Sequence, residues 1–144
     1  MSVGTTAVND PELKALGVQL RILRGQPDLI STTIVQLTDM IGADQAAIAV
    51  NTAQIVILNA QEAARIDEMV ALGDSSATIV ADPAANALAA QITALLASNN
   101  TKTAHIAQVQ SMIDAQNAQL ALLPAQQAAV EAQMVARLDV IRGI

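Results

Sequence analysis

The chain of 144 residues contains no Phe, Tyr or Trp, and this absence restricts the folds that it can adopt. Compact globular cores normally use aromatic side chains, because each one buries a large area in a rigid shape. Without them a core must be filled by Ala, Ile, Leu, Val and Met, which suit the thin layer between closely spaced helices. The sequence therefore predicts an all-α protein, built as a helical hairpin, a bundle or a rod.

A seven-residue repeat of branched aliphatic residues predicts coiled-coil helices. Ile34, Ile41, Ile48 and Ile55 recur at intervals of seven within residues 28–72, and residues 84–123 keep a heptad frame of their own. Apolar residues at the first and fourth heptad positions form a seam that packs against another helix. The predicted oligomerisation seam, called the seam below, comprises Ile34, Leu37, Ile41, Ile48, Ile55, Leu58, Ile66, Leu88, Ile92, Leu95, Ile106, Val109, Ile113 and Leu120.

Helix boundaries are predicted from Asp-Pro, Gly and Pro. Asp10-Pro11 and Asp82-Pro83 are start signals, since Asp caps free amides and Pro is tolerated at the first helical position. We expect a short N-terminal helix that ends at Gly25 and Pro27, helices over 28–72 and 84–123, and a turn over 73–83. Pro124 should kink or restart the helix, and a C-terminal helix is expected over 125–142. Residues 98–101 could split the third helix, although the heptad frame continues across them.

These boundaries predict two regions: an N-terminal arm with a short docking helix over residues 1–27, and a coiled-coil region over residues 28–144. Residues 1–9 are small and polar, and we expect them to order only against a partner. The two long helices resemble each other in style, and no alignable internal repeat is expected.

Four polar residues interrupt the seam: Asp44, Asn51, Asn99 and Gln116. Each would be costly if buried alone. In coiled coils such residues fix register and oligomer number, and this is the interpretation that we favour. Alternatively they meet one another across antiparallel arms, Asp44 with Lys102 for instance, or Asn side chains around a symmetry axis bind water or an ion.

The chain offers little for catalysis or metal binding. It has no Cys and a single His, His105, which falls beside the seam with no carboxylate near it in the sequence. Glycine-rich phosphate loops and the repeated Glu–His pattern of bundle metal sites do not occur. We therefore expect His105 to be a solvated edge residue, and the protein to have no enzymatic activity, cofactor or metal.

The net charge of −6, without aromatic platforms or a basic stripe, argues against nucleic-acid binding. No stretch of about 20 uninterrupted apolar residues occurs, and the start lacks a charged segment followed by an apolar core. The sequence thus predicts a soluble chain with no membrane span and no secretion signal, cytoplasmic unless it belongs to a virion.

Self-association is predicted from the sparse charge of the second half. Between Pro83 and Val130 only Lys102 and Asp114 carry a full charge, whereas a free helix of that length normally carries more. An exposed apolar strip on a monomer would associate. Because the apolar face is wider than a two-stranded seam requires, we expect three or more strands, with a homotrimer favoured.

An aromatic-free, Ala- and Gln-rich, weakly charged helical chain with a small N-terminal arm resembles the virion accessory proteins of tailed bacteriophages: fibres, cement proteins and tail or baseplate connectors. The resemblance is one of style over the whole chain. It implies a structural role in a virion, with other structural proteins as partners. The alternatives are an amphipathic protein that coats a lipid or polymer inclusion, similar to phasins, and an intracellular helical adaptor.

Overall fold

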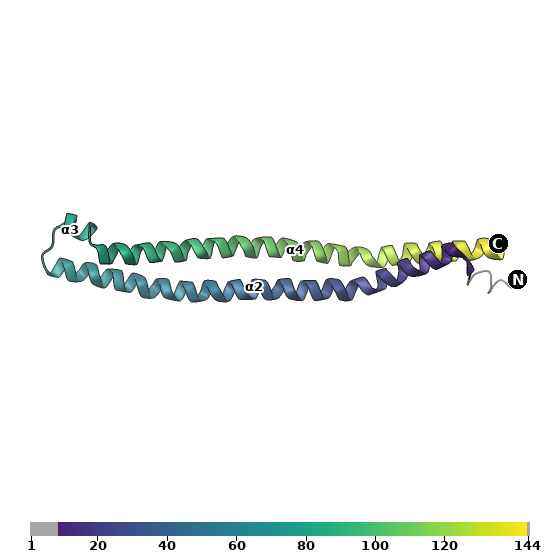
Figure 1. Ribbon diagram of the computed structural model, residues 1–144, viewed down its shortest axis with the longest axis horizontal. Coiled ribbons are helices and arrows are strands. Elements are labelled where there is room, and N and C mark those ends of the chain that lie inside the picture. The colour runs from purple at the N-terminus through teal and green to yellow at the C-terminus, as the bar shows by residue number, and fades with distance from the viewer. Residues whose placement is uncertain (1–8, 144) are drawn as a thin grey trace. The chain divides into compact units, whose positions relative to one another are not determined.

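A computed structural model describes residues 9–143, and helices make up nearly all of them (Figure 1). The elements are α2 (Pro11–Ala71), α3 (Ser76–Val80) and α4 (Pro83–Arg142). None of the described residues forms a β-strand, and the all-α prediction is confirmed. Contacts divide the chain into unit 1, residues 1–37 and 111–144, and unit 2, residues 38–110. The predicted N-terminal arm lies outside the described residues except for Asn9.

The predicted helix breaks at Gly25, Pro27 and Pro124 are wrong, because α2 and α4 run through all three. The predicted boundary at residue 27 therefore falls inside α2, and residues 98–101 continue α4. Pro27 has no N–H, so it leaves the carbonyl of Leu23, four residues earlier, without its helical donor. Gln127 Nε2 of α4 donates to this Leu23 oxygen at 3.2 Å and replaces the missing hydrogen bond.

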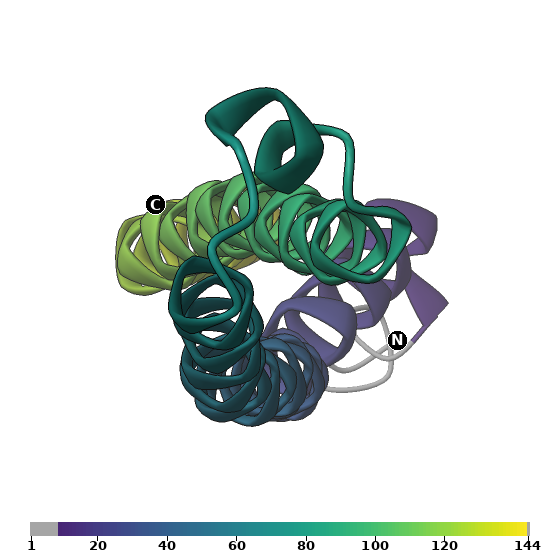
Figure 2. The same ribbon diagram turned by 90° about the vertical axis from the view of Figure 1, so that its left-hand side faces the viewer.

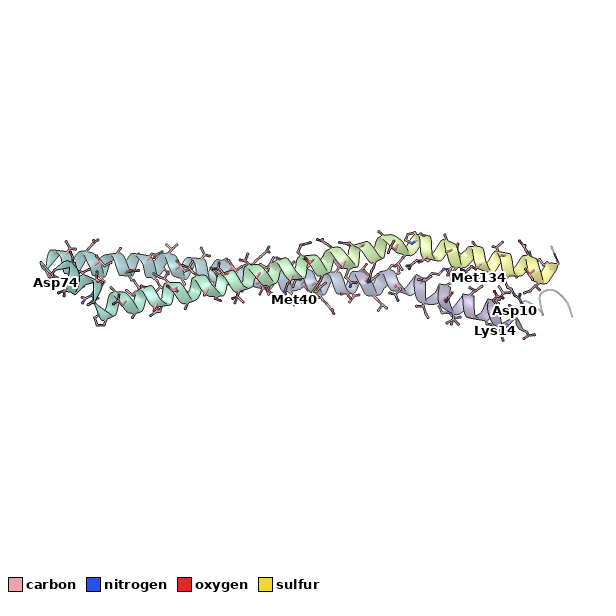
Figure 3. All side chains as sticks on the ribbon, turned by 90° about the horizontal axis from the view of Figure 1, so that it is seen from above. Asp10, Lys14, Met40, Asp74 and Met134 are labelled. Carbon is pink, nitrogen blue, oxygen red and sulfur yellow. The ribbon has the colours of Figure 1, made fainter. Side chains whose placement is uncertain are left out.

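In unit 1 the first part of α2 and the last part of α4 run antiparallel. Leu16, Leu20 and Val130 form a buried cluster, against which Leu23 and Met134 pack. Figure 3 labels Met134 of α4 near Asp10, at the end where α2 begins. The layer between the helices is only one side chain thick on each side, which aliphatic residues can fill without aromatics.

In unit 2 the second part of α2 runs antiparallel to the first part of α4, with Val109 the most deeply buried side chain at 1% exposure. The predicted turn over 73–83 contains the short helix α3, so Ile79 and Val80 are helical (Figure 2). Gly73, with a φ of +80°, ends α2 in the left-handed conformation that favours glycine. Ser75 Oγ caps α3 by accepting from Thr78 N at 3.2 Å.

Every residue of the predicted seam is buried or half-buried, as are Asp44, Asn51, Asn99 and Gln116. Leu37, Leu58 and Ile113 are buried, and Val109 is fully buried. Since this burial arises within a single chain, the seam joins α2 to α4. Its predicted role between chains stays a prediction.

Candidate assembly surface

Each long helix begins at an aspartate that also binds an arginine of the neighbouring helix. Asp82 Oδ2 accepts a hydrogen bond from Ala85 N at 2.9 Å. Arg65 donates to both carboxylate oxygens of Asp82, from Nε at 3.1 Å and from Nη2 at 3.0 Å. The Asp82 side chain is 7% exposed. The Arg65 guanidinium, followed by the Ala85 amide, lowers the pKa of Asp82 below its ordinary value.

The start of α2 has the same construction. Asp10 Oδ2 accepts from Leu13 N at 2.9 Å, and Arg137 donates to Asp10 from Nε at 3.1 Å and from Nη2 at 2.7 Å. Arg137, followed by the Leu13 amide, lowers the pKa of Asp10. Both aspartates could be predicted as caps from the sequence. The arginine partners could not, because the residue that faces each aspartate depends on how the two helices align.

A pH dependence of stability follows from the two aspartates. Their folded-state pKa values lie below the ordinary value of 3.8, so the unfolded chain binds protons more readily. Their contribution is complete above about pH 5 and is lost as the pH falls through the lowered pKa values. We expect the urea midpoint to decrease between about pH 5 and about pH 3. The Asp10→Asn, Asp82→Asn variant should lose part of this decrease; an unchanged slope would contradict the role of the pairs.

The polar residues of the seam in unit 2 meet in pairs across the two helices. Asn51 Nδ2 donates to Asn99 Oδ1 at 2.9 Å. The Asp44 carboxylate is hydrogen-bonded to His105 Nδ1. The suggested pairing of Asp44 with Lys102 is therefore wrong, and Lys102 Nζ instead donates to Ser98 Oγ at 3.2 Å.

The side chain of His105 is 42% exposed, as expected of a residue at the edge of the seam, but it has a carboxylate partner that the sequence did not predict. Its partner lies 61 residues away on the other helix, so no local pattern could reveal it. Gln116, the fourth polar seam residue, is half-buried on α4 in unit 1.

Among residues 9–143 the structure shows no cluster of metal ligands, and a groove in unit 1 has an uncharged lining. None of the His, Asp and Glu side chains among residues 9–143 gather in groups of three that could hold a metal ion. A groove of about 440 Å³ in unit 1 is lined by Ile22, Leu23, Ala129 and Val130 with Gln19, Gln126 and Gln133. Its lining contains no titratable side chain, so acid–base catalysis there has no proton donor or acceptor of suitable pKa.

On the side opposite the seam, each helix carries exposed small and aliphatic residues in two segments, one in each unit, which the sequence had not led us to predict. These residues, called the outer stripes, are spaced by three and four in alternation, apart from a gap of seven between Ala97 and Ala104 that contains Thr101, and all are exposed. In unit 1 they are Ala15, Val18, Ile22, Gly25 and Leu29 on α2, and Ala118, Ala121, Ala125, Ala128, Ala132 and Val135 on α4. In unit 2 they are Gly42, Ala46, Ala49, Ala53, Val56, Ala60 and Ala63 on α2, and Ala87, Ala90, Ala94, Ala97 and Ala104 on α4.

The position of the outer stripes follows from helical geometry. Each stripe residue lies two positions from a buried or half-buried residue, as Val56 does from Leu58. At about 100° per residue, two positions rotate a side chain to nearly the opposite side of the helix. Large members are strongly exposed, among them Leu29 at 65% and Val56 at 64%. Both helices thus have an apolar face directed away from their partner.

One stretch of α2 is long and apolar enough to cross a membrane by length and composition, and 6% of that stretch is buried. The sequence predicted no such span, because it contains no uninterrupted apolar run of about 20 residues. Core helices and signal sequences satisfy the same criterion, so the finding assigns no location.

Comparisons with known proteins found no match to this chain. It matches no protein-family model, and no curated protein or solved structure is similar to it. The geometry of the described residues is therefore the basis for a functional proposal.

Proposed function

We propose that the protein is a non-enzymatic structural protein that assembles with further copies of itself through the outer stripes. The observation that carries this proposal is the second apolar face of α2 and α4, exposed in both units. Contiguous apolar surface on an isolated chain favours association, at about 25 cal/mol for each Å² removed from water.

A second copy of the chain is the occupant that fits these stripes best. Gly and Ala at alternating spacings of three and four allow helix axes to approach closely, and a second stripe of the same kind supplies matching ridges and grooves. The stripe members are uncharged, so a partner needs no complementary charge. Because the seam is occupied within the chain, assembly through the outer stripes replaces the seam as the proposed contact between chains. We still propose that three copies assemble, as a homotrimer.

The resemblance to accessory proteins of tailed-phage virions supports a setting for this assembly. In that setting the protein is a fibre, cement or connector component, and other structural proteins of the particle are its further partners. Its function there is mechanical, and it requires no cofactor.

The second candidate is a helical coat on a lipid or polymer inclusion. The observation that favours it is the apolar stretch of α2, which is mostly exposed. Interfacial helices usually carry Lys or Arg on the polar face and an aromatic anchor on the other. This chain has seven Lys and Arg residues and no aromatic residue, so we rank assembly first.

Sedimentation of the full chain with and without vesicles separates the two candidates. Vesicles of zwitterionic lipid and of mixed anionic lipid would be spun with the protein, and protein alone would be the control. Assembly predicts a discrete oligomer in buffer and no protein in the vesicle pellet. A chain that is monomeric in buffer and pellets with vesicles would overturn the proposal in favour of the coat.

A further inference from the structure

We infer that the chain is a tandem duplication of one 72-residue helical unit, and that a few diverged residues make α2 pair with α4 rather than with α2 of a second copy. The repeats are residues 1–72 and 73–144. Aligned without gaps, 22 of their 72 positions carry the same residue. A chain of this composition would match at about one position in ten by chance, from the squared residue frequencies.

The identical residues include the pairs that fix the helix starts. Asp10-Pro11 aligns with Asp82-Pro83, and Arg65 aligns with Arg137. Asp10 binds Arg137, and Asp82 binds Arg65, each through both carboxylate oxygens. Each aspartate therefore pairs with the arginine of the other repeat in the same geometry.

The burial pattern repeats with the same offset. Over residues 9–71 and 81–143, the buried and half-buried positions coincide except at Ala47 and Asp139. An offset of 72 corresponds to about 20 turns at about 3.6 residues per turn, so the two repeats bury the same face of the helix. The expectation that the two helices cannot be aligned is therefore wrong.

The duplication makes the two units equivalent. Unit 1 combines the first half of repeat 1 with the second half of repeat 2, and unit 2 combines the complementary halves. The first half of α2 could therefore pair, in the same register, with the second half of α2 in another copy. In that arrangement Asp10 would face Arg65, and Leu20, which lies in a cluster with Val130, would face Leu58.

Residues that differ between the repeats disfavour this pairing. Asn51 bonds Asn99, but the counterparts of these residues in the other repeat are Leu123 and Pro27. Pairing α2 with α2 would place Asn51 against Pro27, whose side chain cannot form a hydrogen bond. The half-buried amide of Asn51 would lose its hydrogen bond to the Asn99 oxygen, and this loss disfavours that arrangement.

Gln127 provides a second, independent reason for α2 to pair with α4 and not with another α2. It donates to the Leu23 carbonyl that Pro27 leaves without a helical donor. Its counterpart in repeat 1 is Ile55, which has no donor. Pairing α2 with α2 would leave this carbonyl without a side-chain donor, so Gln127 also selects α4 as the partner.

Engineered cysteines can report the pairing, because the chain contains no cysteine. In the Leu20→Cys, Val130→Cys variant, pairing of α2 with α4 predicts a disulfide within one chain. In the Leu20→Cys, Leu58→Cys variant, only α2 paired with a second α2 brings the two cysteines together. We expect the first variant to form its disulfide within one chain, without a covalent dimer. We expect the second variant to form almost no covalent dimer. The disulfide reports the seam partner alone, so the result is independent of assembly through the outer stripes.

The decisive variant gives the second half of α2 the residues of its counterpart. Asp44→Gln, Asn51→Leu and Ile55→Gln would be added to Leu20→Cys, Leu58→Cys, and the covalent dimer quantified on a denaturing gel without reductant. We expect roughly a tenfold or greater increase in dimer, since Asn51→Leu removes the half-buried amide and Ile55→Gln supplies a donor to the Leu23 carbonyl in the new pairing. The matched control exchanges three exposed residues for their counterparts, Gln45→Asn, Val50→Leu and Asn59→Glu, and should leave the dimer unchanged.

An unchanged dimer fraction in the helical triple variant would overturn the inference, as would abundant dimer in the Leu20→Cys, Leu58→Cys variant alone. If the triple variant loses its helical circular dichroism signal, Asn51→Leu alone provides the test. It should raise the dimer fraction by a smaller factor, and no rise would again contradict the inference.

Discussion

Replacing Val109 by Asp is expected to unfold unit 2 and to reduce the helical signal of the whole chain. Val109 is 1% exposed, the lowest value among the large side chains of the described residues. Aspartate at this position would bury a carboxylate in place of an aliphatic side chain that is almost completely shielded from water. The cost is about 4 kcal/mol or more, a large share of the 5–15 kcal/mol that stabilises a typical domain.

Urea unfolding followed by circular dichroism checks this expectation, with Val50→Asp as the matched control. Val50 is also a valine of unit 2, but it is 69% exposed and lies outside the seam and the outer stripes. The control should change the free energy of unfolding by less than about 0.5 kcal/mol. Equal destabilisation by both substitutions would show that the seam is assigned to the wrong face of the helix.

Placing Asp on the outer stripes of both repeats is expected to separate the copies while each chain stays helical. Val56 and Ala128 hold equivalent positions, 72 residues apart, and both are exposed. In an assembly through the stripes, Val56→Asp with Ala128→Asp would bury two carboxylates in each chain. We expect the dissociation constant to rise roughly a thousandfold, at about 2 kcal/mol for each charge.

Sedimentation equilibrium with parallel circular dichroism measures this effect. The control variant carries Gln61→Asp and Gln133→Asp, which add the same charge at equivalent exposed positions outside the stripes. The control should assemble as the unaltered chain does. Equal dissociation of the two variants would trace the effect to net charge and not to the stripes.

The face of each helix that is buried could be predicted from the sequence, because heptad spacing determines which side chains share a face. Ile34, Ile41, Ile48 and Ile55 are all half-buried at the expected positions. The helix starts at Asp10 and Asp82 could also be predicted from the sequence, since a capping aspartate acts within the first turn of its own helix.

Features that depend on the facing helix could not be predicted. A proline normally ends a helix because it leaves a carbonyl without a donor, and at Pro27 that donor is supplied by Gln127, 100 residues away in the chain. The partner of His105 was missed for the same reason, since Asp44 lies on the other helix.

The outer stripes and the duplication had sequence signals of a different kind. Alanine contributes to helix propensity, so residues such as Ala49 and Ala121 blend into a chain that is rich in alanine. The outer stripes can be recognised by the spacing of their residues. The duplication can be recognised when each residue is compared with the residue 72 positions later. A single heptad frame describes neither feature, because the stripe residues stand at other heptad positions than the seam residues.

The mass of the unaltered protein in native solution tests the central claim most directly. Native mass spectrometry with sedimentation velocity, over a range of protein concentrations, would count the chains in each particle. Assembly through the outer stripes predicts a defined homo-oligomer, three chains in the proposed form, that persists on dilution. A single helical chain of 14.9 kDa at every concentration would contradict the account.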